Sequence, residues 1–274
     1  MAVTTYARPA DRVVPGLSFP RIIKSELIKF RSLRSTWITY VVAVVIGVGF
    51  GLLAAGFRGS EAYQHGEHID LVGLPMHGII IFAQLAIGVV GVLFATGEYA
   101  TGSIRASITA VPKRTPVLLA KASVLGVITA FVAVVMVFIA FWAGEAVLSS
   151  SYHANATIGS SGALRAVTGT ALYVVCVSLM GLGIGFAIRN TGGAIATLVG
   201  VLLVLPLLAS TLPQSWQDHI DKFLPLNIAN HMVETGQHDS GLYALSHGMG
   251  AVMLVIYAAA LLAIGLAVLK RRDV

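Results

Sequence analysis

Residues 97–114 read GEYATGSIRASITAVPKR, a polar stretch between two long apolar runs. Its charged residues are Glu98, Arg105, Lys113 and Arg114. The chain has 274 residues, of which 57% are hydrophobic and 11% are charged, whereas a soluble domain has about 25% charged residues. So large an apolar fraction indicates that the chain lies in a lipid bilayer and that residues 97–114 connect two membrane spans.

A helix needs about 20 apolar residues to cross the hydrocarbon core of a bilayer. Six runs reach about this length, at residues 36–57, 77–96, 117–144, 166–188, 194–212 and 249–269. Apart from Lys121 near the start of the third run, they contain no Asp, Glu, Lys or Arg. The alternation of barrel strands is absent, and an open sheet would leave its backbone without partners in lipid. We therefore predict an all-α integral membrane protein with six transmembrane helices over residues 36–269.

The distribution of charge predicts how these spans are oriented. All but three of the 18 Lys and Arg residues fall on one side, the exceptions being Arg58, Arg165 and Lys222. Eight of the 12 acidic residues lie with those exceptions on the other side. Because basic residues favour cytoplasmic loops, we expect both termini and the 97–116 loop to be cytoplasmic. The net charge of +6 follows from this rule and does not indicate a nucleic-acid partner.

The segments outside the spans have different characters. We expect residues 1–17 to be a disordered cytoplasmic N-terminus and residues 270–274 a cytoplasmic tail. In residues 18–35, apolar side chains recur at helical spacing with basic residues between them, which favours an amphipathic interfacial helix over a cytosolic extension of the first span. Residues 213–248 are partly apolar, and short helices that return toward the membrane are expected in this external segment.

Absent motifs narrow the function. The sequence has no G-x-x-x-x-G-K-[ST] motif for ATP phosphates and no H-E-x-x-H motif for zinc. No ionisable side chain lies deep in a span, as an ion-coupled pump would need. We expect this chain to be no enzyme and to hold no cofactor or metal ion. The HGEHID segment at 65–70 could bind a metal, but a solvated polar loop is the favoured interpretation.

The 97–114 loop has helical features of its own. We predict a short helix over about residues 100–111, ended by Pro112, which restricts the residue before it. Ile104, Ile108 and Val111 then share one face. Glu98 lies near the N-terminal end, where the helix dipole favours a negative charge. This stabilising role explains Glu98 but does not require the Tyr-x-Thr-Gly-x-Ile-Arg string that follows.

The loop resembles the cytoplasmic loop of permease subunits of ABC-2 type exporters, especially bacterial ones. In that family a GEY-x-TG-x-IR string after the second span is followed by a VP-[KR]-R turn and a lysine near the start of the third span, here Lys121. The segments IRNTGGAIATLVGVLLVLP (188–206) and FLPLN (223–227) also resemble family segments. Ala100 departs from the family pattern, since many bacterial relatives have a basic residue there.

The resemblance implies a permease in the bacterial inner membrane that pairs with a second copy of itself, as a homodimer, or with a sister permease. Separate ABC ATPase subunits would bind ATP, and the loop would contain a coupling helix that transmits their motion to the spans. The residues implied in ATPase coupling are Glu98, Tyr99, Thr101, Gly102, Ile104, Arg105 and Ile108. We expect Glu98 at the hinge between span and coupling helix, next to a basic residue of the ATPase. Thr101, Ile104, Arg105 and Ile108 are expected to fill or rim the groove of that subunit.

The transported substrate is left open by the sequence. Uncharged spans suit hydrophobic cargo such as drugs, natural products or lipids, and they equally suit an apolar gate for other cargo. Two alternative functions also remain: a non-transporting membrane anchor or signalling partner of an ABC ATPase, and a self-powered secondary transporter.

Overall fold

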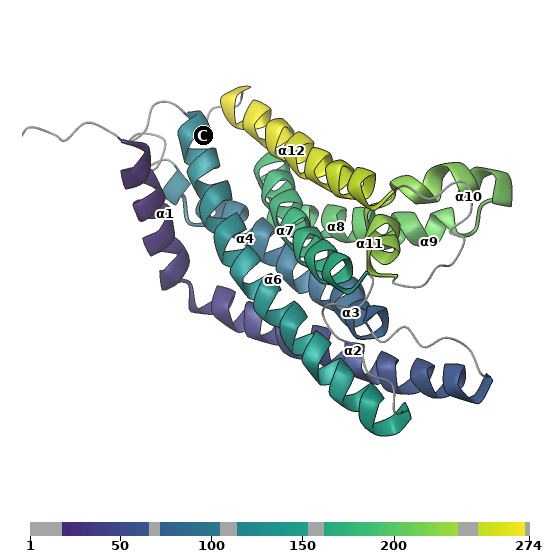
Figure 1. Cartoon of the computed structure of the whole chain (residues 1–274). Helices are drawn as coiled ribbons and strands as arrows, with labels where there is room; N and C mark the ends of the chain where they lie inside the picture. Colours follow the sequence, from purple (N-terminus) through teal and green to yellow (C-terminus); the bar gives the residue numbers. More distant parts are fainter. Residues whose placement is uncertain (1–17, 66–71, 105–113, 153–161, 235–245, 272–274) are drawn as a thin grey trace, which may run out of the picture.

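The computed structural model describes residues 18–65, 72–104, 114–152, 162–234 and 246–271 (Figure 1). Within these residues all regular structure is helical. The elements are α1 (Phe19–Ser32), α2 (Arg34–His65), α3 (Gly73–Gly78), η1 (Ile79–Ala83), α4 (Gln84–Ala100), α6 (Arg114–Tyr152), α7 (Ala163–Ile188), α8 (Thr191–Val199), η2 (Gly200–Val204), α9 (Leu205–Ala209), α10 (Gln214–Ile220), η3 (Asp221–Phe223), α11 (Pro225–Val233) and α12 (His247–Arg271). The predicted disordered N-terminus, residues 1–17, lies outside the described residues.

Among the described residues, six helical stretches are long and apolar enough to cross a membrane, which confirms the predicted fold class. They are Arg34–Glu61, Gly73–Ala100, Arg114–Ser150, Ala163–Ile188, Thr191–Ala209 and His247–Arg271. The second span is formed jointly by α3, η1 and α4, and the fifth by α8, η2 and α9. The chain is therefore a multi-pass membrane protein.

The second and fourth spans form the centre of the bundle, as the positions of α4 and α7 in Figure 1 show. About two thirds of each apolar window is buried there, 67% in both, against 28% in the first span and 22% in the fifth and sixth. The side chains that remain exposed on these outer helices are large and apolar, including Phe57, Leu207 and Val252. Such surfaces are stable against lipid tails or another apolar helix rather than against water.

Glycine allows the two central helices to approach closely. A Cβ atom on Gly91 of α4 would lie 2.0 Å from the carbonyl oxygen of Ser178 in α7, and one on Gly181 would lie 2.2 Å from that of Gly88. Any side chain at these positions would push the helices apart. Small residues are a common means of association between membrane helices, because lipid supplies no hydrophobic force for helix pairing.

Two π-helical turns, η1 and η2, interrupt the second and fifth spans. At the end of η1, the backbone amide of Gln84 donates to Ile79 O. The side-chain amide nitrogen of Gln84, Nε2, donates to Ile81 O at 3.3 Å. The hydroxyl of Tyr173 in α7 donates to Gln84 Oε1 in the centre of the bundle. In η2, the amide of Leu205 donates to Gly200 O, directly before Pro206, which has no amide proton to donate.

The first helix, α1, is separate from the first span. Leu33 leaves helical geometry, with φ −82° and ψ 90°, and α2 begins at the next residue. One face of α1, with Ile22, Glu26 and Phe30, is buried, and this helix packs beside the start of α6. The predicted helix is therefore present, but its inward face includes a carboxylate and its apolar Phe19 is 44% exposed.

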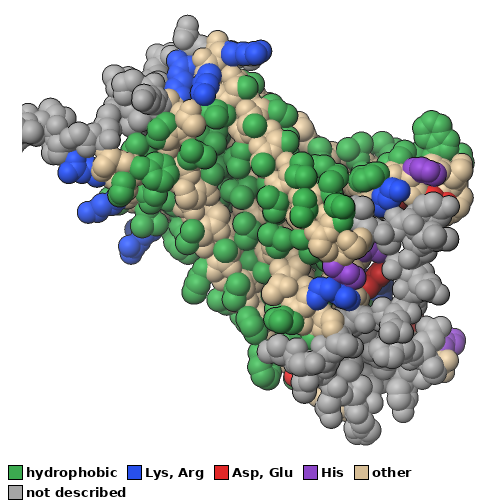
Figure 2. Space-filling view, turned by 45° about the horizontal axis from the view of Figure 1, so that its top comes forward, with side chains coloured by type: hydrophobic (Ala, Val, Ile, Leu, Met, Phe, Trp, Pro, Cys, Tyr) green, Lys and Arg blue, Asp and Glu red, His purple; other side chains and the backbone are tan. Residues whose placement is uncertain are grey.

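The charged groups lie at opposite ends of an apolar band. Figure 2 shows most Lys and Arg side chains gathered at one end, and His, Asp and Glu side chains together with a few basic ones at the other. The first end contains α1, the end of α4, the start of α6 and the end of α12 (Figure 1). The second end contains α10, η3 and α11, which fall in the predicted external segment, and α11 packs on α7.

Candidate functional site

The second span ends in a short hydrogen-bonded motif. The amide of Thr101 donates to Gly97 O at 3.1 Å, and the amide of Gly102 donates to Tyr99 O at 3.2 Å. The Thr101 hydroxyl also donates to Gly97 O, at 2.9 Å. Gly102 has φ +69°, a left-handed conformation that costs glycine little and other residues more. The Thr-Gly pair therefore ends the helix and turns the chain into the loop.

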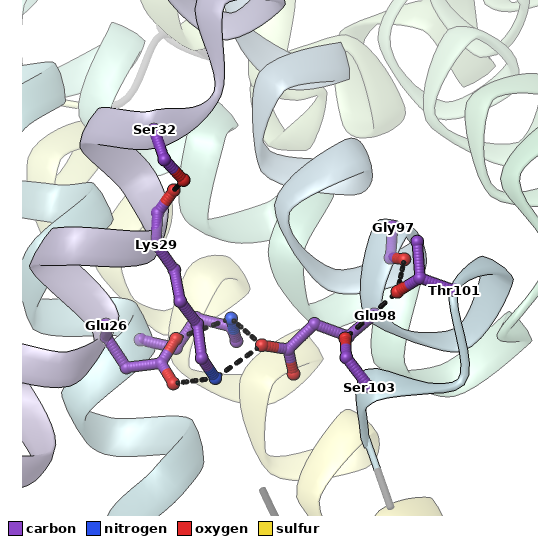
Figure 3. A network of polar contacts seen from close by, with 8 residues as sticks. Glu26, Lys29, Ser32, Gly97, Glu98, Thr101 and Ser103 are labelled. Atoms are coloured by element: carbon purple, nitrogen blue, oxygen red, sulfur yellow. Dashed lines mark hydrogen bonds and ion pairs between the residues drawn. The ribbon is translucent and has the colours of Figure 1, made fainter. Parts of the chain in front are cut away.

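Four charged side chains meet at this point, and we name them the acid–base cluster: Glu26 and Lys29 of α1, Glu98 of α4 and Lys121 of α6. Lys29 Nζ donates to Glu26 Oε1 at 2.7 Å and to Glu98 Oε1 at 2.8 Å (Figure 3). Lys121 Nζ donates to Glu26 Oε2 at 2.6 Å and to Glu98 Oε1 at 3.2 Å. The four residues thus close a ring of ion pairs that joins three helices and carries no net charge.

The cluster is largely shielded from solvent. The side chain of Lys121 is 0% exposed, that of Glu26 is 3% and that of Glu98 is 10%. The ammonium group of Lys121 lies 3.9 Å from the ring centroid of Phe94, and Phe94 packs edge-on against Phe30 of α1. Buried charges of this kind are tolerated when they are paired, and removing one partner costs about 3–5 kcal/mol. The cluster therefore ties α1 to the adjoining ends of α4 and α6.

Lys29 is the most exposed member, with 35% of its side chain accessible. Burial alone would lower the pKa of Lys29, but hydrogen bonds and charge attraction from Glu26 and Glu98 outweigh it and raise this pKa above 10.5. Lys29 is consequently cationic throughout the physiological range.

A cavity of about 360 Å³ opens beside the cluster. Its wall comprises Lys29, Ser32, Leu33, Ser35, Thr36, Leu93, Phe94, Gly97, Glu98, Thr101, Ser103 and Lys121. These residues belong to the junction of α1 and α2, the last turns of α4, the start of the loop and, through Lys121, α6. Within the described part of the chain, Glu98 Oε2 has no hydrogen-bond partner, although it is buried. One oxygen of the Glu98 carboxylate is thus paired with two lysines, and a cavity borders the cluster on another side.

Tyr99 faces a different set of neighbours. Its ring lies edge-on to Phe186 of α7, with 6.1 Å between centroids. The guanidinium carbon of Arg189, at the end of α7, lies 5.3 Å from the centroid of the Tyr99 ring. The two adjacent residues at the end of α4 therefore contact opposite parts of the bundle, since Glu98 contacts α1 and α6.

The structure describes five of the residues that the sequence analysis assigned to ATPase coupling. Glu98, Tyr99, Thr101 and Gly102 lie together at the end of α4, and the side chain of Ile104 is packed in the core at 2% exposure. Arg105 and Ile108 lie outside the described residues. The expected contacts of these residues with an ATPase stay predictions, because the structure contains this chain alone.

Two members of the cluster, Glu26 and Lys29, were missed by the sequence analysis. The basic partner expected for Glu98 on an ATPase stays a prediction, and within this chain Lys29 and Lys121 lie against Glu98. A signal was nevertheless present, because Glu26 lies four residues from both Ile22 and Phe30 on the apolar face of its helix. A carboxylate on such a face predicts a buried cationic partner.

The described residues contain no group of three or more His, Cys, Asp or Glu side chains that could hold a metal ion. Most of the HGEHID segment lies outside them. Cys176 is buried in α7, as expected for a structural thiol.

The sequence of the chain was compared with models of known protein families. Residues 21–274 match the family model described as ABC-2 family transporter protein. No functionally curated protein matches the chain. The match covers all six spans, all but the first two residues of α1 and the loop that follows α4. The chain therefore belongs to the ABC-2 family of transporter proteins, as the membrane-spanning permease component that its helices indicate.

Proposed function

We propose that this chain is the permease subunit of an ATP-driven exporter and that its 97–114 loop receives the motion of a separate ATPase subunit. The observation that carries the proposal is the acid–base cluster. The loop leaves α4 directly after Glu98, and Glu98 is bound to α1 through Lys29 and to α6 through Lys121. A displacement of the loop would therefore be passed to three helices at once.

The charge distribution supports a cytoplasmic location for this end of the bundle. Lys and Arg side chains gather here, as basic residues do on the cytoplasmic side of membrane proteins (Figure 2). Both chain termini would then be cytoplasmic, in a bacterial inner membrane. ATP would be bound by the partner alone, because this sequence has no phosphate-binding loop.

The outer helices support a paired arrangement and an apolar path. Among the described residues, the second and fourth spans pack closely at the centre of the bundle. The exposed apolar faces of the first, fifth and sixth spans provide surfaces on which a second permease copy or a sister subunit can pack. A path lined by such faces suits hydrophobic drugs, natural products or lipids.

The proposal is tested by purifying the tagged chain from its native membrane in mild detergent and identifying its companions by mass spectrometry. We expect a stoichiometric ATPase with a phosphate-binding loop, which hydrolyses ATP faster when the permease is present. Glu98→Gln should leave that ATPase bound but remove the stimulation. The matched control is Glu61→Gln, which removes an exposed carboxylate at the opposite end of the bundle.

A second variant distinguishes a loss of folding from a loss of coupling to the ATPase. Glu98→Gln combined with Lys29→Gln keeps the cluster neutral, so a stable protein that still fails to stimulate the ATPase supports the role of Glu98. A chain that purifies alone and drives vesicle uptake of hydrophobic dyes under an ion gradient would overturn the proposal. A bound ATPase without any such uptake in the presence of ATP, across a panel of drugs and lipids, would favour the anchor function instead.

A further inference from the structure

The C-terminal end of α12 is capped by two other spans. The last four carbonyl groups of a helix have no partner within it. Here Arg189 Nη2 donates to Val268 O at 3.0 Å, and Arg114 Nη1 donates to Leu269 O and, at 3.3 Å, to Lys270 O. We name these two side chains the arginine clamp. Two cations at the negative end of the helix dipole stabilise this end further.

Each arginine of the clamp lies at one end of the 97–114 loop. Arg114 is the first residue of α6, so it marks the point where the loop returns to the membrane. Arg189 contacts the ring of Tyr99, which lies in the last turn of α4, where the loop begins. Both ends of the loop are thereby connected to the same turn of α12, although α12 is far away in sequence.

The backbone of Arg189 supports a specific role for its side chain. Arg189 has φ 59°, and among the described residues it alone combines a positive φ with a side chain larger than glycine's. Its amide donates to Gly185 O at 2.9 Å and ends α7. Glycine or asparagine is usual at such a left-handed helix end, because other side chains strain it. The strain is tolerated here at a position from which a guanidinium reaches both Tyr99 and Val268.

We infer that Arg114 and Arg189 are positioning residues that fasten the end of α12 to both ends of the coupling loop, so that the sixth span moves with the loop. This inference rests on the proposed coupling function. It adds a second connection from the loop to the spans, distinct from the acid–base cluster. The cluster links the loop to α1 and α6, whereas the clamp links it to α12.

The test measures distances between spin labels in the complete transporter, reconstituted with its ATPase subunit in lipid nanodiscs. Cys176→Ser removes the one native cysteine. Labels at Ala100→Cys and Arg271→Cys report on loop and α12, and labels at Ala100→Cys and Ser25→Cys report on loop and α1. These three positions are exposed. Each pair is measured without nucleotide and with ATP plus vanadate.

With an intact clamp, the distance between positions 100 and 271 should be narrowly distributed and the same in both states. Arg114→Gln with Arg189→Gln should broaden it and make it shift when ATP and vanadate are added, while the distance between positions 100 and 25 keeps its wild-type behaviour. Arg114→Lys with Arg189→Lys should restore part of the narrow distribution. Lys270→Gln, which removes a charge from the same turn but no clamp contact, should match wild type.

A double Gln variant whose 100–271 distance stays narrow and unshifted overturns the inference. A third label pair, at Ala100→Cys and Glu61→Cys, reports whether the bundle responds to nucleotide at all. If the distance of this pair is the same with and without ATP plus vanadate, the proposed coupling function fails. The width of the 100–271 distance distribution, measured without nucleotide, still tests the clamp in that case. Arg114→Gln alone, which leaves the Arg189 contact in place, provides a milder variant should the double variant fold poorly, and broadening is expected there too.

Discussion

Charged side chains pair in different ways at the two ends of this helical bundle. At the loop end, the acid–base cluster is buried, hydrogen-bonded and shared by α1, α4 and α6. At the opposite end, His231 of α11 lies 3.7 Å from Glu234, and both side chains are more than a third exposed, at 38% and 48%. Arg165 of α7 adds a hydrogen bond to Glu234 O at 3.1 Å.

This difference indicates which end of the bundle moves as a unit. A buried ion pair fails when either partner is lost, so the helices that share it are held in one arrangement. An exposed pair contributes about 0–1 kcal/mol and restrains its helices little. We therefore expect the loop end to transmit displacement between helices, whereas the His231–Glu234 pair, which lies within one segment, adds little restraint between helices.

The largest expected effect follows from removing Lys121. Lys121→Met should destabilise the protein by about 3–5 kcal/mol, because Glu26 and Glu98 are left with one lysine between them in a buried site. The measurement is the thermal unfolding of the purified protein in detergent. Lys24→Met, which removes an exposed lysine from α1, should leave the melting temperature near that of wild type.

A compensating variant makes this prediction sharper. Lys121→Met with Glu26→Gln leaves the Lys29–Glu98 pair and restores neutrality, so it should recover a large part of the lost stability. If the double variant is less stable than Lys121→Met alone, the lost packing of the lysine stem rather than its charge dominates.

A second prediction concerns the centre of the bundle, between the two ends. Gly91→Ala should cost about 1–3 kcal/mol, because the added Cβ would lie 2.0 Å from the backbone oxygen of Ser178 and the helices must separate. Gly49→Ala is the control, since nothing lies within 4 Å of a Cβ there. That control should be neutral or stabilising by up to about 1 kcal/mol, because alanine favours helix. Equal melting temperatures for the two variants would show that α4 and α7 adapt to the extra atom.

A third, smaller effect is expected at the hinge itself. Gly102→Ala has open space for its side chain but must adopt φ +69°, which costs about 1–2 kcal/mol. A change in the backbone of the turn after α4 can relieve part of this cost, because the rest of the bundle does not have to move. The expected sign is a modest loss of stability together with weaker stimulation of the ATPase. Gly102→Asn, which tolerates the left-handed region better, should lose less of both, and an order reversed between the two variants would contradict the backbone explanation.

Much of the fold follows from the sequence, because the forces that set it act over short distances. The length of an apolar run is enough to predict a span, and six spans are present. The Thr-Gly pair after Tyr99 is likewise local, since a residue that ends a helix does so through its own backbone.

The partners in the acid–base cluster depend on tertiary packing instead. Glu98 is 69 residues from Lys29 in sequence, and Lys121 is 95 residues from Glu26. Nothing in the local pattern selects these pairs, and a lysine between apolar residues of α1 equally suits a lipid headgroup region. The environment of Gln84, directly after the π-helical turn η1, also depends on tertiary packing, because Tyr173, which donates to the Gln84 side chain, lies on another span.

The smallest expected effect lies at the end opposite to the loop. Interaction with the Glu234 carboxylate outweighs burial and raises the pKa of His231 above 6.5, with Arg165 and His247 as nearby charged or titratable groups. A group with a higher pKa in the folded chain contributes stability below its unfolded pKa and loses it as the pH rises through its folded pKa. The contribution of His231 to the melting temperature should therefore fall slightly as the pH rises from 6.5, by the equivalent of about a few tenths of a kcal/mol, while His247, whose pKa is lowered mainly by burial, contributes with the opposite sign.

Glu234→Gln isolates this contribution from the other histidines, because it removes the acid and leaves His231 in place. The difference in melting temperature between wild type and the variant should be present at low pH and vanish above the folded pKa of His231. A difference that persists at high pH would mean that the Glu234 side chain acts through packing or through its charge on a group other than His231. A difference as large as that of Lys121→Met would show that this end is tied as firmly as the loop end, and the two ends could then no longer be assigned different mechanical roles.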